Sequence, residues 1–187
     1  IDKNTTLLNK NFYDFSIKSA KKLIFIGNPP YRTPAYSLTT HKDFISKITK
    51  KYNVMGIREE AVFFILHTID IIRTNNTSGE IHYIVPMSLL KNDSKFYARF
   101  KEFLKEQCHF ANITSLKGPE FEGVSQDLII LSLHVRPSTD TARQETEGLV
   151  SNNQKFVSVD GQKVLLDEYL CLKDTDSIPF QKIFKKT

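Results

Sequence analysis

The sequence predicts an α/β fold: part of a doubly wound sheet that is mostly parallel and ends in an antiparallel hairpin. Three observations support this. An apolar run at residues 23–26 stops at two prolines, a long apolar helix pattern at 59–74 precedes a strand pattern at 80–85, and strand patterns at 110–116 and 128–135 have no helix between them. A helix between two strands makes a right-handed crossover and a parallel pair. Strands without such a helix pair antiparallel or lie apart.

The first strand is followed directly by a rigid turn. Leu23–Ile26 are four consecutive apolar residues, which predicts a fully buried strand. Pro29 and Pro30 have no N–H to donate, so the strand cannot continue past them. We therefore expect the turn Gly27–Tyr31 at the carboxyl edge of the sheet, where open α/β sheets bind ligands.

The chemistry of this turn suits a planar amine. Pro30 holds Pro29 in an extended conformation, which fixes the direction of the Pro29 carbonyl. The carboxamide oxygen of Asn28 can lie beside it, and two neighbouring acceptors hold an amino group while its nitrogen stays electron-rich. The ring of Tyr31 offers a stacking surface worth roughly 1–3 kcal/mol per base. The alternative is an ordinary strand-ending turn.

The run Ile26-Gly27-Asn28-Pro29-Pro30-Tyr31 resembles the catalytic motif of the N6-adenine DNA methyltransferases. The resemblance implies that Asn28 and the Pro29 carbonyl bind the target amine, that Pro30 shapes the turn, and that Tyr31 stacks on a flipped-out adenine. It also implies S-adenosylmethionine as methyl donor, no metal, a Rossmann-like methyltransferase sheet, double-stranded DNA as partner, and a place in a restriction-modification system.

Two basic residues after the turn are candidates for phosphate contacts, Arg32 and Lys42. The net charge is +5, and lysines lie on both sides of the turn. A basic rim around a base pocket fits phosphate binding, although a solvated surface explains it equally well. Phe44, Ile45 and Ile48 predict a short helix in this region.

The helix over 59–74 is apolar on nearly every face, which predicts that it packs on a sheet. His67 within it is expected to be a packed core histidine. The strand that follows ends at Pro86, and Val85–Leu90 resembles the segment after the next strand of the same methyltransferases. Ser88 is then a candidate substrate contact or a helix cap.

A second amphipathic helix is predicted at 94–107, with Ser94 as its cap. The hairpin 110–116 and 128–135 resembles the last hairpin of the methyltransferase sheet. In several adenine enzymes an aromatic residue of the hairpin loop packs against the flipped base, and Phe121 stands in that place. The alternative is that Phe121 plugs the hairpin end.

The chain divides into a partial methyltransferase catalytic domain at 1–135 and, at 136–187, a linker with the start of a possible specificity region. A further hairpin is predicted at 156–166, turning at Asp160-Gly161. The resemblance covers roughly residues 20–135.

No Gly-x-Gly pattern, the usual sign of a donor-binding turn, occurs in the chain. We therefore expect the donor-binding half upstream of Ile1 or in another subunit, and this chain alone to be inactive. Cys108 and Cys171 are expected to be free thiols. With no signal peptide and no membrane-length apolar run, we expect a cytoplasmic protein without membrane contact.

Three functions follow. The first is methylation of adenine N6 in DNA. The second is methylation of a protein glutamine at N5, because a side-chain amide is also a planar NH2 group. The third is a DNA-binding or partner-binding fragment without its own donor site.

Overall fold

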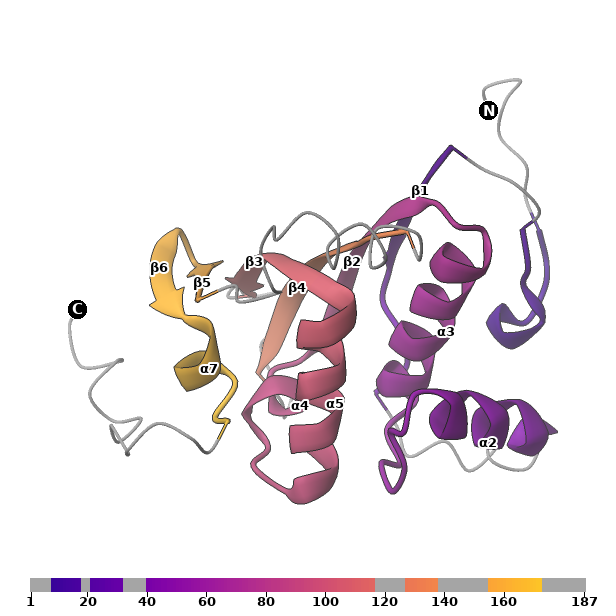
Figure 1. Cartoon of the computed structure of the whole chain (residues 1–187), viewed down its shortest axis with the longest axis horizontal. Coiled ribbons are helices and arrows are strands. Elements are labelled where there is room, and N and C mark those ends of the chain that lie inside the picture. Colours follow the sequence, from indigo (N-terminus) through magenta and orange to yellow (C-terminus); the bar gives the residue numbers. More distant parts are fainter. Residues whose placement is uncertain (1–7, 18–20, 32–39, 117–126, 138–154, 173–187) are drawn as a thin grey trace, which may run out of the picture.

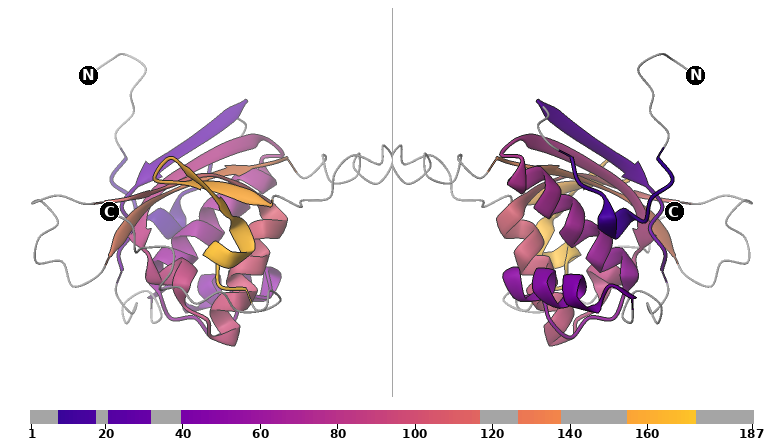
Figure 2. Two further views of the ribbon diagram at one scale, coloured as in Figure 1. Left: turned by 90° about the vertical axis from the view of Figure 1, so that its left-hand side faces the viewer. Right: turned by 90° about the vertical axis from the view of Figure 1, so that its right-hand side faces the viewer.

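A computed structural model of the chain describes residues 8–17, 21–31, 40–116, 127–137 and 155–172, which form a mixed six-stranded sheet with helices on one face (Figures 1 and 2). The strands are β1 (Lys22–Gly27), β2 (Ser78–Pro86), β3 (Cys108–Ser115), β4 (Leu128–Val135), β5 (Phe156–Val159) and β6 (Gln162–Leu165). The helices are η1 (Phe12–Asp14), α2 (Lys42–Lys51), α3 (Glu60–Thr74), α4 (Ser88–Lys91), α5 (Lys95–Gln107) and α7 (Leu166–Tyr169).

The sheet order is β1-β2-β4-β3-β5-β6. The strands β1 and β2 are parallel with α3 between them in the chain, as the sequence predicts. The strand β4 lies between β2 and β3 and is antiparallel to both, so the predicted hairpin is confirmed. The described sheet continues beyond this hairpin, because β5 is parallel to β3 and pairs with β6.

The helices begin and end close to the predicted positions. Glu59 is the N-cap of α3, and Arg73 lies in its last turn, where a cation faces the negative end of the helix dipole. Ser94 is the N-cap of α5, but its side chain makes no capping bond. Instead, the Ser94 N–H donates to Asn92 Oδ1 at 3.0 Å. The predicted helix around Phe44 is α2.

The core lies between the sheet and these helices. Ile81, Tyr83 and Val85 of β2 alternate with less buried residues and face the helices, and each is at most 4% exposed. Buried residues of α3 and α5 meet them, including Ile65 and Phe100. His67 is buried as expected, and Cys108 and Cys171 are free thiols.

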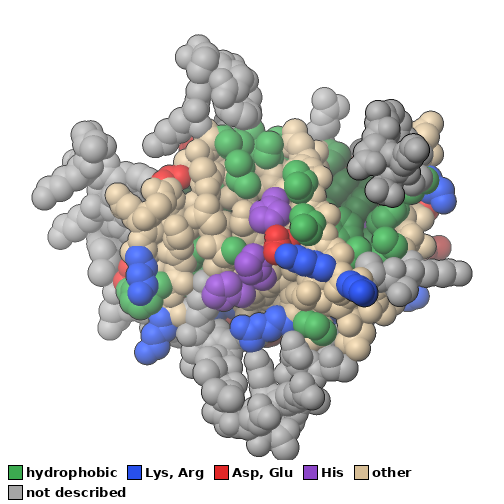
Figure 3. All heavy atoms as spheres, turned by 90° about the horizontal axis from the view of Figure 1, so that it is seen from above, with side chains coloured by type: hydrophobic (Ala, Val, Ile, Leu, Met, Phe, Trp, Pro, Cys, Tyr) green, Lys and Arg blue, Asp and Glu red, His purple; other side chains and the backbone are tan. Residues whose placement is uncertain are grey.

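The opposite face of the sheet is not covered by the described helices (Figures 2 and 3). This corrects the prediction that β1 is fully buried, because Ile24 is 56% exposed and Ile26 is 81% exposed. Leu23 and Phe25 point to the helices, whereas alternate residues of a strand point to the other face. An apolar run predicts burial but does not tell whether both faces of the strand are covered.

None of the described helices has both the length and the apolar character needed to cross a lipid bilayer.

Candidate functional site

The predicted turn follows β1 directly. Asn28 and Pro30 are exposed, Pro29 is buried and Tyr31 is half-buried. The Tyr31 hydroxyl donates a hydrogen bond to Asn28 Oδ1. Burial raises the pKa of Tyr31, so the phenol keeps its proton and remains the donor at neutral pH. A carboxamide oxygen has two lone pairs, so Asn28 Oδ1 keeps one for a ligand N–H.

The turn is supported from the core side by Tyr83. Gly27 is the register partner of Tyr83 in the parallel pair. The Tyr83 hydroxyl lies 2.6 Å from Thr68 Oγ1, and Thr68 Oγ1 donates to the Phe64 carbonyl at 2.8 Å. The Thr68 hydroxyl has a single proton, which it donates to the Phe64 carbonyl. The Tyr83 hydroxyl is therefore the donor in its hydrogen bond with Thr68 Oγ1. Burial raises the pKa of Tyr83 to about 12.

The ends of β2 and β3 are joined to the start of β4 at the same edge of the sheet. The N–H of Met87, which follows β2, donates to the Asp127 carbonyl at 2.8 Å. The N–H of Leu116, which follows β3, donates to the Leu128 carbonyl at 2.9 Å. Leu116 and Asp127 therefore both lie at this edge, and Phe121 lies outside the described residues.

Of the three other candidate contacts, two lie among the described residues and one lies outside them. Ser88 is exposed at the start of α4, and because the N-cap is Met87, the alternative role of Ser88 as a helix cap is wrong. Lys42 is exposed as the first residue of α2. Arg32 lies outside the described residues. The contacts of Ser88 and Lys42 with a substrate stay predictions.

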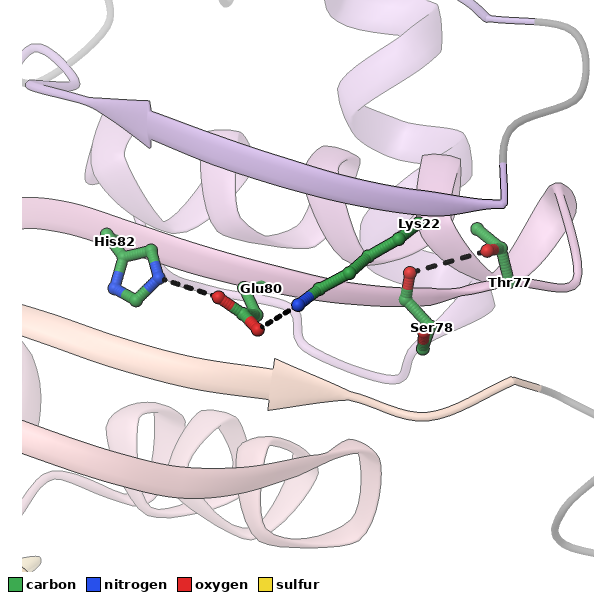
Figure 4. Close-up of polar contacts among 5 residues, drawn as sticks. All are labelled: Lys22, Thr77, Ser78, Glu80 and His82. Carbon is green, nitrogen blue, oxygen red and sulfur yellow. Dashed lines mark hydrogen bonds and ion pairs between the residues drawn. The ribbon is translucent and has the colours of Figure 1, made fainter.

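Sequence reasoning missed a polar cluster on the open face of the sheet (Figures 3 and 4). The Lys22 ammonium lies 2.6 Å from Glu80 Oε1, and His82 Nε2 lies 3.3 Å from Glu80 Oε2. His82 Nδ1 lies 3.0 Å from Ser132 Oγ. The Lys22 hydrogen bond lowers the pKa of Glu80 below its usual range. The available signal was the alternation of polar residues in the first part of β2 (78, 80 and 82) and in the last part of β4 (132 and 134).

A pocket of about 480 Å³ adjoins this cluster, lined by Lys22, Glu80, His109, His134 and Arg136 among others. It lies where β2 and β3 begin and β4 ends, which is the opposite end of the sheet from Asn28. Among the described residues, no group of His, Cys, Asp and Glu is arranged to hold a metal ion. Because of its position at the opposite end of the sheet, the pocket is separate from the predicted amine site.

The aromatic N-terminal segment has a structural role that the sequence did not reveal. The ring of Phe12 stacks on Phe64 of α3, with centroids 4.5 Å apart. The Tyr13 hydroxyl donates to Glu60 Oε1 at 3.2 Å. His67 Nε2 lies 3.2 Å from the Phe15 carbonyl, and burial lowers the pKa of His67. This cluster packs residues 12–15 against α3.

A protein-family model described as Eco57I restriction-modification methylase matches residues 1–121 of the chain, which is well over half of its length. No curated protein matches the chain.

Several solved structures are similar to this chain. A putative class I S-adenosylmethionine-dependent methyltransferase from Listeria monocytogenes has a TM-score of 0.50 and 14% identity, covering 79% of this chain and 38% of that one. A modification subunit of a putative type I restriction enzyme from Vibrio vulnificus has a TM-score of 0.48 and 14% identity, covering 77% and 37%. A type I restriction-modification methyltransferase subunit from Streptococcus thermophilus has a TM-score of 0.42 and 14% identity, covering 87% and 33%.

The likeness to the Listeria protein shows the fold, an α/β methyltransferase sheet. The chain spans less than two-fifths of the length of each of these three proteins.

Proposed function

Because this chain belongs to the Eco57I restriction-modification methylase family, we propose that it carries the target-base half of a DNA methyltransferase that acts on the N6 amine of adenine. The donor is S-adenosylmethionine, which supplies an electrophilic methyl group. The chain contains no Gly-x-Gly turn, and we assign none of its residues to donor binding.

The observation that carries this proposal is the exposed corner after β1. Asn28 is accessible while the ring of Pro29 is buried, so the corner is anchored on one side and open on the other. Asn28 Oδ1 and the Pro29 carbonyl each accept one N–H of the adenine amine. These hydrogen bonds orient the nitrogen lone pair toward the methyl group and favour the positive charge that develops on the amine.

Tyr31 contributes both a ring face and a hydroxyl. Its hydroxyl bond to Asn28 Oδ1 orients the carboxamide and leaves one lone pair for the substrate. Its half-buried ring is a surface on which the flipped base stacks. Flipping costs a few kcal/mol, and stacking of this kind offsets part of that cost.

The remaining candidate residues belong to the DNA-binding part of the proposal. Lys42 and Arg32 contact phosphates, Ser88 contacts the substrate from the end of β2, and Phe121 packs against the flipped base. Exposure of Lys42 and Ser88 supports their share of this assignment. Double-stranded DNA and the donor-binding half, supplied by another segment or subunit, are the proposed partners.

The test is the substitution Asn28→Ala in the complete methylase. We expect methyl transfer to duplex DNA to fall by at least a hundredfold, with donor affinity measured by calorimetry unchanged. The control is Asn9→Ala, which removes an exposed asparagine far along the chain from the turn. Undiminished methyl transfer by Asn28→Ala contradicts the role of Asn28.

The same corner also fits a side-chain amide, so a protein glutamine is the second candidate substrate. A labelled-donor assay with duplex DNA in one reaction and protein acceptors in the other separates the two. Label that appears only in protein contradicts the DNA proposal.

A further inference from the structure

Three neighbouring strands carry polar side chains in one row on the open face of the sheet. In register, Glu80 of β2 pairs with His134 of β4, and His134 pairs with His109 of β3. Side chains of residues paired in this way lie on the same face of a sheet. The rings of His109 and His134 are next to each other, with centroids 6.3 Å apart. The row forms part of the pocket at the end of the sheet opposite Asn28.

Two permanent cations belong to the same pocket. Arg136, which follows β4, lines it together with the two histidines. Lys22 reaches it from β1, and its ammonium lies 2.6 Å from Glu80 Oε1 (Figure 4). Arginine offers five N–H donors and lysine three, and neither side chain accepts a hydrogen bond. The pocket is therefore rich in donors and in positive charge.

The one carboxylate that lines the pocket, that of Glu80, already has partners for both oxygens. Oε1 is paired with Lys22, and Oε2 lies 3.3 Å from His82 Nε2. A carboxylate only accepts hydrogen bonds, so His82 Nε2 is the donor in this contact. The other ring nitrogen of His82 lies 3.0 Å from Ser132 Oγ. Glu80 therefore holds Lys22 and His82, and it does not neutralise the other cationic groups.

The remaining donors of the pocket are exposed. His109, His134 and Arg136 form no hydrogen bond or ion pair within the part of the chain that the structure describes. Burial, together with the charges of His134 and Arg136, lowers the pKa of His109. These three groups therefore repel one another when they are charged. An anion bound between them relieves this repulsion, whereas a metal cation adds to it.

The size and arrangement of the pocket suit a phosphate group on a small molecule. Its volume of about 480 Å³ falls within the range of small-molecule sites, which is roughly 300–1,000 Å³. The donors come from β1, β3 and the end of β4, so they do not lie in the single plane that a carboxylate presents. A phosphate group has several oxygens in a tetrahedral arrangement and accepts from donors in different directions.

We propose that this pocket binds a small phosphorylated molecule through its phosphate group, at a site separate from the amine site. Asn28 follows Lys22 by six residues, which is about 20 Å along an extended strand. The phosphate bound here is therefore not the one beside the target adenine. The site lies outside the proposed function and does not depend on it.

Protonation of His109 and His134 is coupled to this binding. The charged and titratable groups that face the two histidines are Lys22 of β1, Glu80 and His82 of β2, and Arg136 after β4. A bound dianion favours the imidazolium form of both rings and raises their pKa. Glu80 stays ionised above pH 6, because the Lys22 hydrogen bond lowers its pKa. Binding of a dianion is therefore expected to tighten about tenfold between pH 8 and pH 6.

Equilibrium dialysis of the complete methylase against radiolabelled sulfate tests the site without an activity assay. Sulfate is a tetrahedral dianion that does not titrate between pH 6 and pH 8. Inorganic phosphate and uridine 5′-monophosphate are the competitors, and uridine is the matched control without a phosphate. We expect both competitors to displace the label and uridine to leave it bound. A nucleotide is the ligand if the monophosphate acts at a tenfold lower concentration than inorganic phosphate, and equal concentrations assign recognition to the phosphate group alone.

Two substitutions locate the bound sulfate. Arg136→Gln removes a fixed charge from the pocket and is expected to weaken sulfate binding at least tenfold. Arg58→Gln removes an exposed arginine between α2 and α3 and is expected to leave binding unchanged. His134→Arg keeps an N–H donor and makes the charge permanent, so at pH 8 this variant should bind sulfate as tightly as the original protein does at pH 6. A purely structural role of His134 predicts no such gain.

The contrary results are equally specific. Full sulfate binding by Arg136→Gln overturns the site, and so does an equal loss in Arg58→Gln, which would indicate diffuse attraction to a basic surface. Displacement of sulfate by a short DNA duplex but not by uridine 5′-monophosphate overturns the small-molecule ligand. Asn28→Ala is expected to leave sulfate binding unchanged whatever it does to methyl transfer, so the failures of the two proposals are distinguishable.

Discussion

Gly27 and Tyr83 are register partners in the parallel pair β1–β2, and the Tyr83 ring lies 3.4 Å from the position that a Cβ on Gly27 would occupy. Through its hydroxyl, Tyr83 is hydrogen-bonded to Thr68 of α3. The residue that precedes Asn28 therefore rests on a side chain fixed by the core. The position of the exposed corner is set by buried contacts rather than by the turn alone.

Substitutions of Gly27 test this support. A Cβ at 3.4 Å is within ordinary contact distance, so Gly27→Ala is expected to change the free energy of unfolding by less than about 1 kcal/mol. Gly27→Val adds two methyl groups that must displace the Tyr83 ring, and overpacking of this kind costs about 1–3 kcal/mol. Urea unfolding of the two variants measures the difference. Equal destabilisation by alanine and valine would show that the ring does not limit the space.

The hydrogen bond between Tyr83 and Thr68 predicts an asymmetry. Tyr83→Phe removes a donor, but Thr68 Oγ1 still donates to the Phe64 carbonyl, so the expected cost is about 1 kcal/mol. Thr68→Val leaves the Tyr83 hydroxyl without its acceptor in a residue that is 4% exposed, which costs about 1–3 kcal/mol. Thr68→Val is therefore the more destabilising change in urea unfolding. The reverse order would mean that Thr68 is the donor to Tyr83.

Local patterns predicted the strands and the three longest helices of this fold, but not the short helices η1, α4 and α7. The helix α3 and the turn at Asp160-Gly161 follow from short-range signals, and both turn residues have positive φ angles, 48° and 80°. The position of β4 between β2 and β3 depends on contacts between distant segments. The apolar run Ile24–Ile26 carries no sign of whether helices cover one face of its strand or both, so the exposure of Ile24 and Ile26 was not predictable.

For the candidate site, the sequence likewise predicted the position of the turn but not its side-chain contacts. The double proline fixes where β1 ends, and this alone predicts that Asn28 lies at the carboxyl edge of the sheet. The hydrogen bond from Tyr31 to Asn28 depends on side-chain rotamers and had no signal in the sequence. The polar cluster around Glu80 and His82 did have a signal in the sequence, because these polar residues alternate with apolar ones along β2.

Tyr31 is expected to act mainly through its ring. In the complete methylase, Tyr31→Phe keeps the stacking surface and loses only the hydroxyl bond to Asn28, so methyl transfer should fall no more than about tenfold. Tyr31→Ala removes the ring and should weaken binding of the flipped base by about 1–3 kcal/mol. Binding to duplexes with and without a mismatch at the target adenine measures this. Equal loss in both variants would assign the effect to the hydroxyl instead.

The contact between Lys91 and Tyr169 predicts a dependence of stability on pH. The Lys91 ammonium donates to the Tyr169 carbonyl at 2.5 Å and lies 3.3 Å from the centroid of the Tyr169 ring. This joins α4 to α7. Burial lowers the pKa of Lys91 to about 8 from its usual value of 10.5, because the charged form is desolvated.

The sign of the effect follows from proton binding. Between pH 8 and 10 the unfolded chain holds the Lys91 proton and the folded chain has begun to lose it, so this residue makes the free energy of unfolding rise with pH. Below pH 8 its contribution is constant and unfavourable. Lys91→Met removes the titration, so the stability of the variant should rise less steeply than that of the original protein between pH 8 and 10. Lys163→Met, an exposed lysine on β6, is the control and should leave the slope unchanged. Parallel urea-unfolding profiles for Lys91→Met and the original protein would show that the Lys91 ammonium is not desolvated in the folded state.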